Sequence, residues 1–209
     1  MTPRDVVLEA HGDGDGNQRG AIIWLTGLSG SGKTTLATHA DSQLRRIGYL
    51  VVRLDGDELR RTISRDLGFS TEDRHEHSRR TAQAAGQLAA AGRVVLVALI
   101  SPFASDRDAA RRLAPRFFHE VYVDASLQVC EHRDPRQLYR RARNGEIPHF
   151  TGISSPYEAP SNPDLHIETG VLDIASSVAR LVGYVMAHVP PTISVAQPVA
   201  PFDVRSVRA

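Results

Sequence analysis

Short apolar runs alternate with longer stretches of mixed polarity along the central part of this chain. The runs are rich in β-branched residues and end at turn residues or at aspartate, which is typical of buried β-strands. These runs cover residues 21–26, 50–54, 94–100 and 121–123, with a weaker one at 166–168. The intervening stretches predict helices after Lys33 and at 74–91, 106–113, 127–133 and 174–186. Strands flanked by helices indicate an α/β fold, with a mostly parallel five-stranded sheet covered by helices on both faces.

The two outer segments lack this alternation. Residues 1–19 include the glycine- and aspartate-rich stretch 12–17, which has little means of burying apolar surface and predicts a flexible N-terminal tail. Residues 189–209 are rich in Pro and Val without a period and predict a C-terminal tail. We therefore expect one folded domain at 20–188.

Composition narrows the function classes. The chain has 209 residues, with 25 Lys and Arg against 24 Asp and Glu, so it lacks the basic excess of a protein that coats nucleic acid. The longest apolar run, 94–100, is too short to cross a bilayer, and the N-terminus shows no apolar signal region. Cys130 is the one cysteine, which excludes an intrachain disulfide and fits a reducing cytosol. We expect a soluble cytoplasmic protein with no membrane or nucleic-acid partner.

A glycine-rich loop joins the first strand to the first helix. It reads Gly27-Leu28-Ser29-Gly30-Ser31-Gly32-Lys33-Thr34 and fits the pattern G-x-x-x-x-G-K-[ST]. Glycines let successive N–H groups point at phosphate oxygens, and the helix N-terminus adds a positive dipole end. Lys33 would neutralise the β- and γ-phosphates, and the Thr34 hydroxyl would ligate Mg²⁺. The loop predicts binding of a magnesium–nucleoside triphosphate, and leaves the acceptor open.

Two carboxylates follow the second strand. Asp55 and Asp57 stand at the carboxyl end of that strand, where parallel sheets hold their ligands. They are placed to hold Mg²⁺ through water and to accept a hydroxyl proton, and Arg60 lies one helical turn beyond. The alternative is structural: Asp57 caps a short helix and Asp55 ends the strand.

Two further segments suggest where an acceptor binds. Phe69 beside Arg74 suits a planar base that carries an anion, since an aromatic ring stacks and guanidinium groups bind oxyanions. Phe69 is equally compatible with a place in the core, and Ser70 with a helix cap. Ser101 follows the third strand and faces the ligand side, although it could equally satisfy the local backbone.

Together these segments resemble the adenylylsulfate kinase family, enzymes that phosphorylate adenosine 5′-phosphosulfate. The resemblance runs from about residue 22 to 172 and includes 27–35, 54–57, 66–74, 100–107 and a long block at 123–160. The late block is not general to nucleotide kinases, so the resemblance is specific. It implies a P-loop NTPase fold with a lid at 140–159, ATP and Mg²⁺ as co-substrate and cofactor, a homodimer and a role in sulfate assimilation.

The resemblance also implies roles for individual residues. ATP-binding positions are Gly27, Leu28, Ser29, Gly30, Ser31, Gly32, Lys33, Thr34, Thr35 and Arg133. Acceptor-binding positions are Asp57, Arg60, Phe69, Arg74, His77, Ile100, Ser101, Arg136 and Phe150. Thr34 and Asp55 are the metal positions, and the catalytic positions are Lys33, Asp55, Asp57 and Ser101. Ser101 matches a serine described as a phosphorylated intermediate, but direct in-line transfer needs only positioning and charge stabilisation.

Some positions depart from the family pattern. His77 stands where Asn is usual, Arg136 and Gln137 replace Lys-Gly, and Ser154 replaces Asp. An Arg for Lys keeps the charge and adds a planar fork. Two alternatives stay open: a P-loop kinase with another hydroxyl acceptor, or a nucleotide-binding subunit without turnover.

Overall fold

A computed structural model describes residues 20–190. The predicted N-terminal tail, 1–19, and all but the first two residues of the predicted C-terminal tail, 189–209, lie outside this part. Five strands form one sheet in the order β2-β3-β1-β4-β5. Their bounds are β1 (Ala21–Thr26), β2 (Val51–Asp55), β3 (Val94–Ala98), β4 (Phe118–Asp124) and β5 (Leu165–Glu168). Every neighbouring pair is parallel, which confirms the predicted α/β fold with its parallel sheet.

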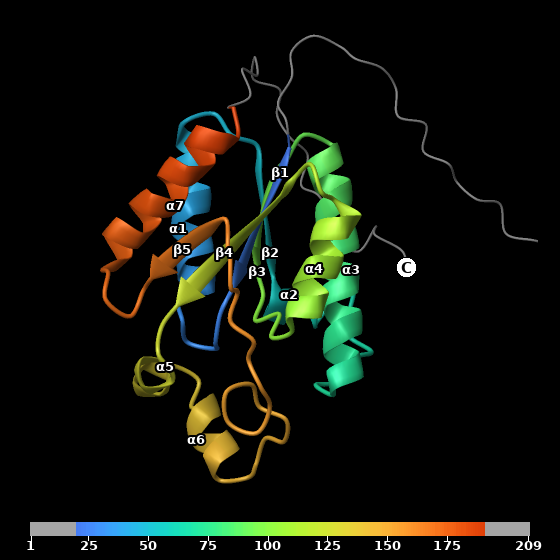
Figure 1. Ribbon diagram of the computed structural model, residues 1–209, viewed down its shortest axis with the longest axis vertical. Helices are drawn as coiled ribbons and strands as arrows, with labels where there is room; N and C mark the ends of the chain where they lie inside the picture. Colours follow the sequence, from blue (N-terminus) through green and yellow to red (C-terminus); the bar gives the residue numbers. More distant parts are fainter. Residues whose placement is uncertain (1–19, 191–209) are drawn as a thin grey trace, which may run out of the picture.

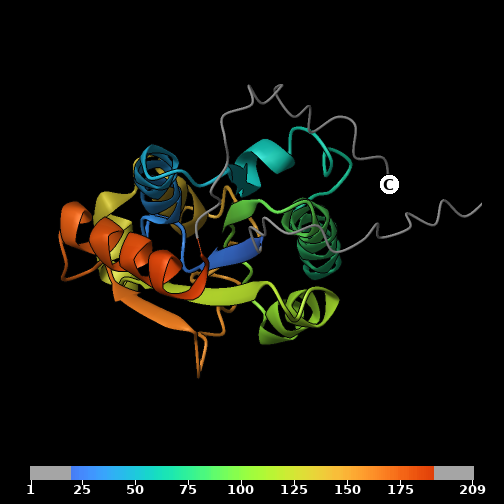
Figure 2. The ribbon, with the colours of Figure 1, turned by 90° about the horizontal axis from the view of Figure 1, so that it is seen from above.

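Helices cover both faces of the sheet, as predicted. Helices α1 (Lys33–Arg46) and α7 (Ile174–His188) pack on one face, and α3 (Thr71–Ala90) and α4 (Ala104–Leu113) on the other (Figure 1). The view from above in Figure 2 shows these two helix layers on either side of the strands. Helix α2 (Gly56–Leu59) follows β2, and α5 (Leu127–Arg133) and α6 (Leu138–Arg143) lie beyond the carboxyl ends of the strands (Figure 1).

The central strand β1 shows why the strands are continuously apolar. Ile23 and Leu25 pack into the layer of α1 and α7, whereas Ile22 and Trp24 pack into the layer of α3 and α4. Successive side chains of a strand point to opposite faces, so a strand covered on both faces needs apolar residues throughout. Each large side chain buried in this way contributes roughly 1.5–3 kcal/mol. The two cores fix the sheet whose carboxyl edge carries the site.

Several predicted boundaries were wrong. Strand β3 ends at Ala98, not at residue 100, because the chain turns sharply at Ser101 (φ 38°). Helix α6 was not predicted, and a short helix at α2 was expected only in the alternative that Asp57 caps it. Helix α3 begins at Thr71, where Ser70 caps it by accepting a hydrogen bond from the Asp73 N–H. Val189, predicted to begin the tail, is buried, and its carbonyl accepts a hydrogen bond from the Tyr49 hydroxyl at 2.7 Å. The packed domain therefore includes Val189. None of the helices within residues 20–190 has the length and apolarity needed to span a membrane.

Candidate active site

A cavity of about 1310 Å³ opens at the carboxyl ends of the strands. It is larger than the 300–1,000 Å³ typical of a site for one small molecule, so its volume suits two ligands. The cationic side chains that line it are Lys33, Arg60, Arg74, Arg133, Arg136 and Arg141. The acidic ones are Asp55, Asp57, Asp134 and Asp173. The excess of cations favours anionic ligands.

The phosphate loop forms one wall of the cavity. Gly27, Gly30 and Gly32 have φ values of 152°, 77° and 102°, which L side chains rarely adopt, and a Cβ on Gly27 would clash with the Val123 carbonyl. Lys33 folds back over the loop, and its Nζ donates to the carbonyl oxygens of Gly27 and Leu28 at 2.8 and 2.7 Å. Burial lowers the pKa of Lys33 to about 8. A desolvated ammonium held only by neutral carbonyls is well placed to exchange them for phosphate oxygens.

The loop residues divide between two sides. Ser29, Gly30, Ser31, Gly32, Thr34 and Thr35 line the cavity with Lys33. Gly27 contributes backbone conformation rather than cavity surface. The Leu28 side chain points away and packs against the apolar cluster of α5 and α6, so of this residue only the carbonyl reaches Lys33.

Thr34 and Asp55 meet at the point where a metal ion is expected. The Thr34 hydroxyl donates to Asp55 Oδ2 at 2.7 Å, and Asp55 Oδ1 accepts from the Asp57 N–H at 3.0 Å. Asp55 is therefore the cap of α2, and the alternative that Asp57 caps this helix is wrong. Within residues 20–190, no three His, Cys, Asp or Glu side chains are grouped to hold a metal ion. A hydroxyl and one carboxylate fit Mg²⁺, which completes its shell with water and phosphate oxygens.

An exposed aromatic ring lies at the other end of the cavity. Phe69 is 56% exposed, so the alternative that it belongs to the core is wrong. The Arg60 guanidinium lies 4.4 Å above the Phe69 ring centroid, and that of Arg74 lies 5.8 Å away. Arg74 is buried and donates to the His149 carbonyl at 2.9 Å. Burial is the main cause of the lowered pKa of both guanidinium groups. A flat ring with two guanidinium groups beside it can stack a base and bind an oxyanion.

Ser101 is held by the core in a left-handed backbone conformation (φ 38°). Its hydroxyl accepts from the Trp24 indole N–H at 3.0 Å, and its carbonyl accepts from Arg107 Nη1 at 2.8 Å. Neither partner is a base, and the remaining contact of the hydroxyl, at 3.5 Å, is the Leu99 carbonyl. Nothing that Ser101 touches would activate it as a nucleophile. Ile100, beside it, also lines the cavity.

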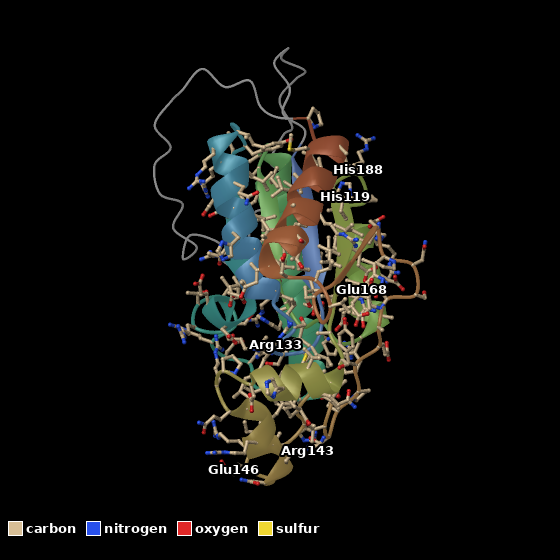
Figure 3. All side chains as sticks on the ribbon, turned by 90° about the vertical axis from the view of Figure 1, so that its left-hand side faces the viewer. His119, Arg133, Arg143, Glu146, Glu168 and His188 are labelled. Atoms are coloured by element: carbon tan, nitrogen blue, oxygen red, sulfur yellow. The ribbon has the colours of Figure 1, made fainter. Side chains whose placement is uncertain are left out.

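The segment after α5 closes the cavity from the outside. Arg133 donates to the Gly30 carbonyl at 3.3 Å and to the Thr169 carbonyl at 2.6 Å, and Figure 3 shows it well above the outer tip that carries Arg143 and Glu146. Arg136 forms an ion pair with Asp57 on the opposite wall. Phe150 is buried, and Ser154 caps its turn by accepting from the Phe150 N–H at 3.0 Å. Arg133 and Arg136 lie just before the predicted lid at 140–159. The lid itself contacts the acceptor end through the His149 carbonyl, which accepts a hydrogen bond from Arg74.

Sequence reasoning missed the wall formed by the start of α7. It consists of Thr169, Leu172, Asp173, Ile174, Ala175 and Ser177. Thr169 Oγ1 lies 2.7 Å from the Ser31 carbonyl and 2.9 Å from the Asp124 carbonyl, so it ties this wall to the loop. No sequence signal marks these residues, because small polar and aliphatic side chains far along the chain resemble an ordinary helix start.

Comparison with known proteins decides between the kinase classes that such a site allows. The sequence pattern of the family described as adenylylsulphate kinase matches residues 19–168. The chain belongs to the adenylylsulphate kinase family. Its activity is accordingly that of an ATP-dependent phosphotransferase, the adenylyl-sulfate kinase activity. An adenylyl-sulfate kinase of Bacillus pumilus is 52% identical over 170 residues, which cover 81% of this chain and 86% of the relative. The family resemblance drawn from the sequence is confirmed.

Solved structures agree with adenylylsulphate kinase membership. The Mycobacterium tuberculosis APS kinase in complex with AMPPNP and APS has a TM-score of 0.78 and 44% identity, covering 81% of this chain and 99% of that one. A hexameric APS kinase from Thiobacillus denitrificans has a TM-score of 0.61 and 28% identity, covering 81% of this chain and 29% of that one. A gluconokinase from Sinorhizobium meliloti, at 21% identity and a TM-score of 0.52, shares only the fold.

Proposed function

We propose that this cavity transfers the γ-phosphoryl group of ATP to the 3′-hydroxyl of adenosine 5′-phosphosulfate, giving ADP and 3′-phosphoadenosine 5′-phosphosulfate. The observation that carries the proposal is one cavity with a phosphate loop at one end and the Phe69 ring with Arg60 and Arg74 at the other. The Asp55–Asp57 turn lies between them, where the two substrates would meet. The APS kinase structure with AMPPNP and APS, similar over most of its length, supports both substrates.

The ATP end of the cavity, at the phosphate loop, would stabilise phosphate charge and position the γ-phosphoryl group. Lys33 and the loop N–H groups hold the β- and γ-phosphates, and Arg133 lies over Gly30 at the edge of the loop. Thr34 and Asp55 would hold Mg²⁺, which neutralises phosphate charge when bound. Asp55 already uses one oxygen for Thr34 and the other for the Asp57 N–H, so its role is to orient rather than to take a proton.

Asp57 is the better proton acceptor of the two aspartates. Its side chain is about half exposed toward the cavity, and Arg136 contacts one of its oxygens. A carboxylate beside the nucleophilic hydroxyl accepts its proton as the phosphoryl group transfers. Phe69 and Phe150 would bracket the acceptor base, with Arg60 and Arg74 on its phosphosulfate end. Ser101 shapes the floor between Ile100 and the core without forming a covalent intermediate.

The family resemblance further supports a homodimer, a cytoplasmic setting and a role in sulfate assimilation. Equilibrium sedimentation of the purified chain distinguishes a dimer from the hexamer named for the Thiobacillus relative.

The decisive test is a coupled assay of ADP release with purified protein, Mg·ATP and a panel of acceptors. Adenosine 5′-phosphosulfate is expected to give turnover, with the 3′-phosphorylated product seen by mass spectrometry, whereas gluconate and adenosine 5′-monophosphate serve as comparison acceptors. Turnover of another acceptor with none of adenosine 5′-phosphosulfate would overturn the assignment. ATP binding without any phosphoryl transfer would identify a non-catalytic subunit.

A further inference from the structure

One histidine in the acceptor end has an unused nitrogen. His77, on α3, is 3% exposed and lines the cavity. Its Nδ1 lies 2.9 Å from the hydroxyl of Ser64, whereas its Nε2 is buried with no hydrogen-bond partner among residues 20–190. A Cβ built on Gly56 would lie 3.8 Å from Nε2, so this nitrogen faces the Asp55–Asp57 turn. An unpaired buried nitrogen carries a desolvation cost, which a ligand that pairs with it would relieve.

The Ser64 hydroxyl determines which ring nitrogen carries the proton. Ser64 is fully buried, and within the described residues the one partner of its side chain is His77 Nδ1. A buried hydroxyl hydrogen needs an acceptor, and only an unprotonated Nδ1 provides one. The opposite arrangement would strand both the Ser64 hydrogen and the Nε2 lone pair. The pair is therefore satisfied when Ser64 donates to Nδ1 and the ring proton is on Nε2.

The charged neighbours of His77 keep the ring neutral. Arg60, Arg74 and Arg80 surround it, and Asp57 is the one acidic group that opposes them. Burial and these guanidinium groups lower the pKa of His77 to about 3. At neutral pH the ring thus has no charge and one N–H, on the nitrogen that faces Gly56 in the Asp55–Asp57 turn of the cavity wall.

We propose that Ser64 is a positioning residue that holds His77 in its Nε2–H tautomer, which makes His77 a fixed hydrogen-bond donor to the acceptor nucleotide. This proposal rests on the proposed function. It gives the acceptor end a preference for nucleotides with a hydrogen-bond acceptor atom opposite His77 Nε2. The His77 N–H favours acceptor nucleotides that present an oxygen or ring-nitrogen lone pair at this point. It disfavours nucleotides that present an N–H group there, because two hydrogen-bond donors would then face each other.

The tautomer can be tested without activity. Nuclear magnetic resonance of the full chain with ¹⁵N-labelled histidine distinguishes the two tautomers by the shifts of the ring nitrogens. His77→Phe identifies the signals of His77 among the nine histidines, since it removes only those. We expect the Nε2–H pattern in the wild-type chain and a mixture in Ser64→Ala. A wild-type Nδ1–H pattern, or a pattern unchanged in Ser64→Ala, would overturn the proposal.

Steady-state kinetics test whether the His77 N–H forms a hydrogen bond with the acceptor nucleotide. Ser64→Ala is expected to raise KM for adenosine 5′-phosphosulfate roughly threefold to tenfold, the loss of one neutral hydrogen bond, with KM for ATP unchanged. His77→Phe should cost at least as much, and His77→Gln should recover part of the loss because its amide N–H₂ reaches the place of Nε2. Ser64→Ala should add nothing in the His77→Phe background, because both changes act through one donor.

Ser42→Ala is the matched control, since Ser42 is an exposed serine on α1 that bonds only the Thr38 carbonyl. Thermal unfolding of every variant distinguishes a loss of folded protein from the loss of the His77 N–H as a hydrogen-bond donor. Additive effects, or equal increases of KM for both substrates, would overturn the proposal. A wild-type chain that does not phosphorylate adenosine 5′-phosphosulfate would refute the proposed function, while the tautomer measurement would still decide the role of Ser64.

Discussion

The Thr34 hydroxyl donates to Asp55 Oδ2 at 2.7 Å, which joins the phosphate loop to the end of β2. These are the two side chains that would hold Mg²⁺. We predict that Asp55→Asn lowers kcat about 100-fold or more, because it removes the charge but keeps an oxygen to cap α2. The Mg²⁺ concentration that gives half-maximal rate should rise. Titrating Mg²⁺ at saturating ATP measures both, with Asp41→Asn on the surface of α1 as control. An unchanged Mg²⁺ requirement would count against the metal role of Asp55.

Lys33→Ala should greatly lower turnover while leaving the fold intact. The ammonium bonds only to carbonyls of its own loop, so its removal frees two carbonyls and disrupts no ion pair among the described residues. We expect a loss of about 100- to 1,000-fold in kcat, typical of a group that stabilises transition-state charge. Steady-state rates and circular dichroism melting report the two effects separately. Equal loss of rate and stability would mean that Lys33 is structural.

The low pKa of Lys33, about 8 instead of 10.5, gives a specific pH dependence. Free enzyme loses this charge as pH rises through about 8, so kcat/KM for ATP should fall there. Bound phosphate favours the charged form, so kcat should stay flat to higher pH.

The lowered pKa of Lys33 also predicts that the free energy of unfolding rises with pH, whereas kcat/KM falls. Between pH 8 and 10.5 the unfolded chain binds more protons at Lys33 than the folded chain, so stability increases with pH in this window. Lys33→Met should remove this increase and be more stable than wild type at pH 7. Denaturant unfolding at pH 7 and 10 measures it, and a constant difference between the two proteins would contradict the prediction.

Phe69→Ala should weaken binding of the acceptor nucleotide without changing ATP binding or the stability of the fold. The ring is mostly exposed, so its truncation changes the free energy of unfolding by about 0.5 kcal/mol or less. Loss of a stacked base costs about 1–3 kcal/mol, so KM for adenosine 5′-phosphosulfate should rise roughly 5- to 150-fold at unchanged KM for ATP. Phe69→Tyr is the control that keeps the ring. A large loss of stability in Phe69→Ala would instead place the ring in the fold.

Arg107→Ala should unfold the acceptor floor. Arg107 is buried, pairs with Glu120 at 2.6 Å and donates to the carbonyls of Ser101 and Glu158. Its removal leaves a largely buried carboxylate whose remaining cation among the described residues is Arg111, at 3.9 Å, so the expected cost is about 3 kcal/mol, the lower end of the range for a broken buried pair. Denaturant unfolding should show this, with Arg112→Ala on the exposed side of α4 as control. Recovery in Arg107→Ala/Glu120→Gln would confirm that the stranded charge is the cause.

The sequence predicts the five parallel strands of the sheet and a glycine-rich loop after the first of them, and most residues of this loop line the cavity. Strand β1 has its predicted bounds because its apolar run is buried on both faces. Helix α6 was missed because it is only six residues long and rich in arginine, so its apolar side is too short to show a helical period. The Asp134 carboxylate organises its start by accepting from the N–H groups of Leu138 and Tyr139. Thr169 and Ser64 were missed for a similar reason: their roles depend on partners far away in the chain, Ser31 and His77, and no spacing records such pairs.

The anchoring of Val189 by Tyr49 has a practical consequence. The chain enters the described domain before β1 and leaves it after Val189, and both points lie at the edge of the sheet opposite the cavity (Figure 1). A fluorescent reporter attached directly at either of these two points would therefore lie far from the cavity mouth. Protein immobilised at these points should keep its full turnover, whereas attachment through the α6 segment would obstruct substrate entry.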